Sequence, residues 1–100
     1  MTTHVHSCDA LRPIDDELAA AFSAAQAAGA SALVVVFPAD AKLTRELVPR
    51  IAGLAHAAPT LTALALVHES PNLSFIASSL ALQLPGVRVR SAASADTTGL

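Results

Sequence analysis

The chain has 100 residues, of which 53% are hydrophobic and 14% are charged, and its formal net charge is −2. This length predicts a single domain, because domains commonly run to roughly 100–150 residues, and the low charge with high apolar content excludes a disordered chain. Six basic residues give no electrostatic footprint for nucleic acid, and the single cysteine, Cys8, excludes an intramolecular disulfide.

Membrane-spanning and secretory segments are not indicated. The longest unbroken apolar run, Ala32 to Phe37, is far too short to cross a bilayer. No basic stretch precedes an apolar run at the start of the chain, so no signal peptide is predicted and the cytoplasm is the expected location. Much of the hydrophobic content comes from 23 alanines. Alanine buries little area per residue, and we therefore expect a thin core that an oligomer interface would help to stabilise.

The first predicted elements are a short strand and a helix. Thr2 to Ser7 alternates its side chains and predicts a half-exposed strand. Pro13 and the three acidic residues after Ile14 predict a helix start, since acidic groups in a first turn complement the helix dipole. Gly29 predicts the end of this helix, because the residue after a helix often needs a positive φ.

Two further strand–helix units follow. Ser31 to Phe37 is apolar at every position, which is typical of a strand covered by helices on both faces. Thr44 can cap the next helix, in which Pro49 predicts a kink or a later start because proline removes a backbone hydrogen bond. Thr62 to Val67 predicts a central third strand. Ser70–Pro71 predicts another helix start, with serine as the cap and proline in the first helical position.

The end of the chain predicts one more strand and a tail. Pro85–Gly86 ends the third helix. Val87 to Arg90 strictly alternates apolar and charged residues, which predicts an edge strand with one solvent-exposed face. Residues 1–90 are therefore expected to form one α/β domain and residues 91–100 a polar, flexible tail. The βαβαβαβ order predicts a small three-layer-type domain with about four mostly parallel strands. A flavodoxin-like strand order is one of the arrangements that this pattern allows.

Polar residues gather in the loops that follow the predicted strands. In a parallel sheet, ligands bind at the carboxyl ends of the strands, where loops and helix N-termini meet. These loops predict a binding site for a small anionic metabolite or a lipid head group, with five candidate residues: Asp40, Lys42, His68, Glu69 and Ser70. The alternative is that Ser70 only caps its own helix and that His68 and Glu69 only solvate a loop.

The most chemically suggestive cluster lies at the N-terminus. His4, His6 and Cys8 are two residues apart, so in a strand all three point to the same side. Imidazole and thiolate are good zinc ligands, and Asp9 lies close by. A small metal-dependent enzyme or metal carrier is therefore one hypothesis, and only this hypothesis implies a cofactor, namely zinc. The alternative is an exposed edge strand. Because no glycine-rich phosphate loop or G-x-S-x-G motif occurs, catalysis has no other support.

Several segments resemble STAS-type domains, and in particular the subgroup related to the sporulation anti-sigma-factor antagonists. The matching stretches lie within residues 14–90: Ala32–Asp40, Leu43–Leu47, Ala63–Val67, Glu69–Pro71 and Leu84–Arg90. The resemblance implies a STAS-like strand order and a protein- or lipid-binding module rather than an enzyme. Phosphorylatable members carry a serine at the start of the second helix, where Thr44 is the only hydroxyl here.

The leading functional hypothesis is a small, non-enzymatic regulatory or interaction domain. It would bind a protein partner or itself, and a homodimer is expected, because an edge strand such as Thr2–Ser7 or Val87–Arg90 can pair across a two-fold axis. An anionic ligand at the strand ends and a metal at His4, His6 and Cys8 are the alternatives. Nucleic acid is not an expected partner.

Overall fold

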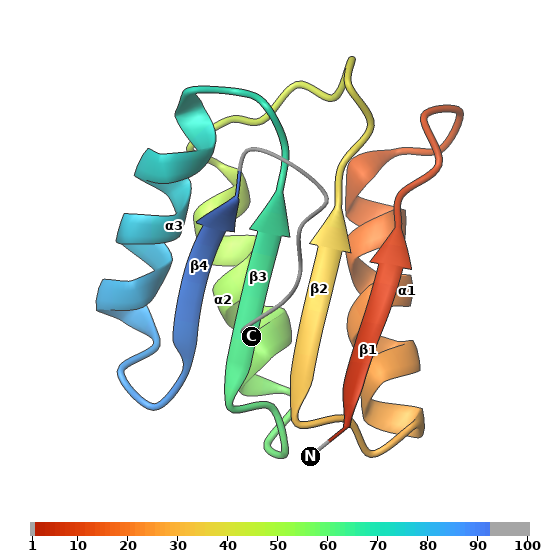
Figure 1. Ribbon diagram of the computed structural model, residues 1–100, viewed down its shortest axis with the longest axis vertical. Helices are drawn as coiled ribbons and strands as arrows, with labels where there is room; N and C mark the ends of the chain where they lie inside the picture. The colour runs from red at the N-terminus through yellow and green to blue at the C-terminus, as the bar shows by residue number, and fades with distance from the viewer. Residues whose placement is uncertain (1, 93–100) are drawn as a thin grey trace.

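The computed structural model describes residues 2–92, and the part of the expected tail from residue 93 onward lies outside the described residues. The described chain alternates strands and helices (Figure 1), which confirms the α/β class and the βαβαβαβ order. The elements are β1 (Thr3–Ser7), α1 (Ile14–Ala27), β2 (Ala32–Val36), α2 (Leu47–His56), β3 (Ala63–Val67), α3 (Asn72–Gln83) and β4 (Arg88–Ala92). The last strand thus continues beyond Arg90, where the alternating pattern had predicted its end.

The sheet is parallel throughout, and its spatial order is β1-β2-β3-β4. A flavodoxin-like order, in which the order of the strands reverses inside the sheet, is therefore not the one observed. The register aligns Thr3, Ala32, Ala63 and Arg88. The strands consequently end level with one another, and the loops after β1, β2 and β3 leave from one edge of the sheet.

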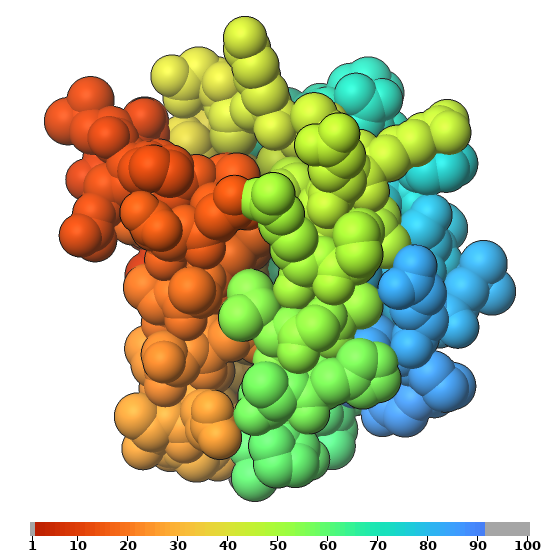
Figure 2. All heavy atoms as spheres, turned by 180° about the vertical axis from the view of Figure 1, so that it is seen from behind, coloured from red at the N-terminus to blue at the C-terminus, as the bar shows by residue number. Residues whose placement is uncertain are grey.

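The helices lie behind the sheet in Figure 1, and the view from behind in Figure 2 shows α1, α2 and α3 side by side. Each connection moves one strand along in the same direction, and right-handed crossovers then place every helix on the same face. This face carries Leu33, Val35, Leu64 and Leu66, which form the main core with apolar residues of all three helices.

The opposite face of the sheet holds a second, smaller cluster. Val34, Ala65 and Val67 are buried there, and Val36 packs against them. The apolar sequence of β2 had suggested helices on both of its faces, but none of the helices between residues 2 and 92 contributes to this second cluster. The difference follows from the sequential strand order, which sends all the crossovers to one side.

The helix ends explain several features of the sequence. Gly29 has a φ of +66°, and its N–H donates to Gln26 O while the N–H of Ala30 donates to Ala25 O, a Schellman motif that ends α1 as predicted. α2 begins at Leu47, so Pro49 lies in the first turn, where its missing N–H is not needed; the prediction of a later start is confirmed. No helix in the described range is long and apolar enough to cross a membrane.

The core can be tested with two leucines of α3. Leu80 is 0% exposed and Leu82 is 86% exposed. Leu80→Ala should lower the free energy of unfolding by about 2–5 kcal/mol, because it removes buried methyl groups and leaves a cavity. Leu82→Ala, the matched control on the same helix, should change it by less than about 0.5 kcal/mol. Urea unfolding measures both values, and equal losses in the two variants would contradict this packing.

Candidate functional site

Three side chains with metal-binding chemistry meet where β1 ends and α1 begins. His6 lies in register with Val35, a residue of the main core, so its ring points toward the helices. Cys8 follows β1, and its backbone N–H donates to Val36 O at 2.8 Å, which fixes the chain beside β2. Glu17 lies in the first turn of α1 and is only 3% exposed.

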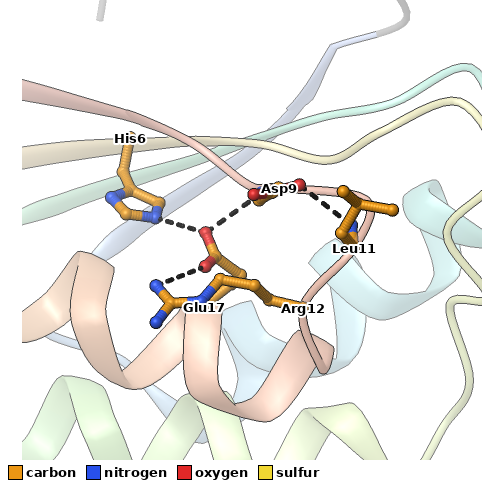
Figure 3. A network of polar contacts seen from close by, with 5 residues as sticks. All are labelled: His6, Asp9, Leu11, Arg12 and Glu17. Carbon is orange, nitrogen blue, oxygen red and sulfur yellow. Dashed lines mark hydrogen bonds and ion pairs between the residues drawn. The ribbon is translucent and has the colours of Figure 1, made fainter.

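The buried carboxylate of Glu17 is the centre of a polar network with His6, Asp9 and Arg12 (Figure 3). His6 Nε2 lies 3.0 Å from Glu17 Oε2, and the backbone N–H of Asp9 donates to the same oxygen at 3.1 Å. Because an ionised carboxylate only accepts hydrogen bonds, His6 must carry its proton on Nε2. The hydrogen bonds from His6 and Asp9, together with the charge of Arg12, hold the pKa of Glu17 below its ordinary value of 4.5 against the opposing effect of burial.

The loop between β1 and α1 is folded so that the N–H of Asp9 and the guanidinium of Arg12 point toward Glu17. The carboxylate of Asp9 accepts a hydrogen bond from the N–H of Leu11 at 2.9 Å, and its carbonyl accepts one from the N–H of Arg12. This turn aims the N–H of Asp9 at Glu17 and brings the guanidinium of Arg12 to 3.5 Å from Glu17 Oε1. Asp9 thus supports the group through its backbone, while its side chain is engaged in the turn.

Cys8 is a partly buried free thiol that packs against the main core. Burial, and after it the negative charge of Glu17, raises the pKa of Cys8 to about 11. At neutral pH the side chain is therefore a thiol and not the nucleophilic thiolate. This electrostatic environment argues against a role for Cys8 as a catalytic nucleophile.

The predicted N-terminal metal cluster is rearranged in the structure. The ligand atoms of His6, Cys8 and Glu17 all lie within 4.8 Å of one another. His4 points to the same side of β1 as His6 but is not part of this group, because it lies four residues before Cys8, roughly 13 Å along the strand and away from the start of α1. Two of the three predicted ligands are therefore together, and Glu17 stands where His4 was expected.

The sequence predicts Glu17 only as a helix-dipole charge, one of three acids in the first turn of α1. It lies three residues after Ile14 and four before Ala21, on the apolar stripe that also holds Leu18. Asp15 lies equally close to this stripe, three residues before Leu18 and seven before Phe22, yet both Asp15 and Asp16 are exposed. Tertiary contact therefore decides which acid is buried, and a charged residue that is buried must have partners.

The five residues predicted to bind an anion occupy different places. Asp40 and Lys42 line a cleft together with Asp9 and Arg12, and this cleft does not include His68, Glu69 or Ser70. Its charged lining mixes two acids with two bases, which gives no net positive field for an anion.

His68 and Ser70 fasten the neighbouring loops to each other. The backbone N–H of Ser70 donates to His68 Nδ1 at 2.6 Å, so the proton of His68 is on Nε2, which lies 3.0 Å from Pro38 O. Ser70 Oγ accepts a hydrogen bond from the N–H of Asn72, the first residue of α3. This contact lies just before α3, whose N-cap residue is Pro71 and not Ser70, and Glu69 is exposed.

Comparison with known proteins does not add to this description. No protein-family model matches the chain, and neither curated proteins nor solved structures give a significant match.

The charge of Glu17 can be tested through the pH dependence of stability. Glu17→Gln keeps the shape of the side chain but removes its charge, and at neutral pH the variant should unfold at lower urea concentration than the parent. Because the folded-state pKa of Glu17 lies below 4.5, its stabilising contribution is complete above that value and is lost as the pH falls through the lowered pKa. The difference between the two proteins should therefore close in acid.

The matched control is Glu46→Gln, which changes an exposed glutamate just before α2. This substitution should leave the urea midpoint nearly unchanged at every pH. A difference between the parent and Glu17→Gln that stays constant or widens on acidification would contradict an ionised, stabilising Glu17.

Proposed function

We propose that the protein is a small, non-enzymatic interaction domain that binds a second copy of itself through the edge strand β1. The observation that carries this proposal is that the edge strand β1 lacks residues that would prevent another strand from pairing with it. β1 lies at one end of the sheet, and its five residues are Thr3, His4, Val5, His6 and Ser7. None is a lysine, an acid or a proline, which are the residues that natural sheets use to keep an edge from pairing.

The outer backbone groups of β1 can be identified from its bonds to β2. Thr2 O accepts hydrogen bonds from the N–H groups of Ser31 and Ala32, and the Cys8 N–H donates to Val36 O. Alternate residues of an edge strand face the neighbour, so the even-numbered residues bond to β2. The N–H and C=O groups of Thr3, Val5 and Ser7 therefore point outward and are available to another strand.

The strand at the other edge of the sheet, β4, carries charged residues. β4 contains Arg88 and Arg90, and like charges brought together across a two-fold axis would repel. β1 has no such charge when its histidines are neutral. This contrast favours β1 over β4 as the strand that pairs.

A two-fold axis through the middle of β1 gives the pairing a natural register. Val5 is the central residue of the strand and is 50% exposed. An antiparallel pair centred on it places Val5 opposite the partner's Val5, and Thr3 opposite the partner's Ser7. The sheets of two copies would then join into one continuous sheet with an isologous interface. Each favourable cross-strand pair of this kind contributes about 0.2–1 kcal/mol.

The resemblance to STAS-type domains supports the same class of function, because it implies binding rather than catalysis. A regulatory role would follow if the edge of β1 also accepts a strand from another protein in place of the second copy. Competition between the two partners would then set how much of the protein is paired.

Sedimentation equilibrium at high micromolar concentration tests this proposal. The parent chain should sediment with twice the mass of a single chain. Val5→Pro should shift it to the mass of one chain, because proline removes an outward N–H without breaking a bond to β2. Val5→Lys should have the same effect by placing a charge at the centre of the pair.

Ala81→Lys is the matched control, since it adds the same charge at an exposed position on α3, and it should keep the mass of the parent. A parent protein that sediments as one chain at this concentration would overturn the proposal. So would a Val5→Lys variant that remains paired.

A further inference from the structure

We propose that His6, Cys8 and Glu17 form a binding site for a divalent transition-metal ion, with zinc as the ion that this set of ligands fits best. This inference goes beyond the proposed self-association, because it concerns the side chains that β1 directs toward the helices. The backbone groups that face the outer edge belong to other residues of the strand.

The spacing of the three ligand atoms is close to that of a zinc site. Nitrogen, oxygen and sulfur ligands lie about 2.0–2.3 Å from zinc, so in a tetrahedron they are about 3.3–3.6 Å from one another. His6 Nε2 and Glu17 Oε2 are already 3.0 Å apart, and every separation within the group is at most 4.8 Å. A bound ion would therefore have to draw together ligand atoms that already lie within 4.8 Å of one another.

Glu17 is held in position by groups that would not bind the metal. The N–H of Asp9 and the guanidinium of Arg12 contact its two oxygens, and they fix the carboxylate at the start of α1. Such supporting contacts orient ligands and are a regular part of metal sites. A metal ion would take the place of the proton that His6 now shares with Glu17, and it would bring positive charge to a carboxylate that is almost fully buried.

The chemistry of the donors selects among metals. One imidazole, one thiolate and one carboxylate are a borderline set that suits zinc and its neighbours in the first transition row. Calcium and magnesium prefer oxygen ligands alone and would not gain from Cys8. Coordination releases one proton from Cys8 Sγ to solvent, while the single proton of the neutral His6 ring moves from Nε2 to Nδ1 so that Nε2 can bind the metal, and no electron transfer is involved.

Three protein ligands leave one tetrahedral position open. Asp9 and Arg12, which contact Glu17, also line the cleft with Asp40 and Lys42. The fourth position would be filled by water or by a small donor, and this cleft lies beside the residues that contact Glu17. His4 is too far along β1 to complete the set, which makes it a natural control.

Titration with Co²⁺ tests this site, because cobalt replaces zinc in tetrahedral sites and its absorption reports on the ligands. The parent protein should show a thiolate-to-cobalt charge-transfer band in the near ultraviolet and visible bands typical of tetrahedral cobalt, and zinc should abolish both. Cys8→Ser should remove the charge-transfer band. His6→Gln should weaken zinc binding at least about tenfold, as measured by competition with a chromophoric chelator.

His4→Gln is the matched control, since it changes a histidine of the same strand and the same face, and it should bind zinc as the parent does. Circular dichroism of each variant establishes that it is folded, and Cys8→Ser and His6→Gln avoid any change to the buried Glu17. The proposal would be overturned if the parent shows no charge-transfer band, if Cys8→Ser retains it, or if His4→Gln and His6→Gln weaken binding equally. Sedimentation of the same samples reports separately on self-association.

Discussion

A buried carboxylate at the start of α1 is the constraint around which one end of this molecule is organised. Glu17 is 3% exposed, and an ionised group at such a position must be matched by donors. The ring of His6, the N–H of Asp9 and the guanidinium of Arg12 meet this requirement. They come from β1 and the loop after it, so the network joins the edge strand to the helix layer. Cys8 lies beside this network, with its ligand atom within 4.8 Å of those of His6 and Glu17, and completes the candidate metal site.

The sequential strand order places β1 at one end of the sheet. A doubly wound sheet has a reversal in strand order that opens a ligand crevice between two loops. Here the order is β1-β2-β3-β4, and no such reversal occurs among the described strands. The loops after β2 and β3 are instead fastened by His68, which joins Pro38 to Ser70. The candidate metal ligands lie instead at the end of β1, which is both the edge strand of the sheet and the strand that carries His6.

Much of the fold could be predicted from the sequence because its signals are local. Apolar runs predicted β2 and β3, Gly29 predicted the end of α1, and Pro49 indicated that α2 starts late. The placement of all the helices on one face could not be predicted, because it depends on strand order, which alternating elements leave open. At the site, the alternation of β1 correctly put His6 and Cys8 on one side. Glu17 was missed because its role arises from tertiary contact and not from spacing within one segment.

The claim that Glu17 is ionised and held by the end of β1 can be tested most directly by nuclear magnetic resonance. The side-chain carboxyl carbon of Glu17 and the backbone amide of Asp9 would be followed in one pH titration. The structure predicts that the carboxyl carbon titrates below the ordinary glutamate value and that the Asp9 amide shifts with the same midpoint, because the two groups share a hydrogen bond. A midpoint at or above the ordinary value, or an Asp9 amide that does not respond to it, would contradict this account of the molecule.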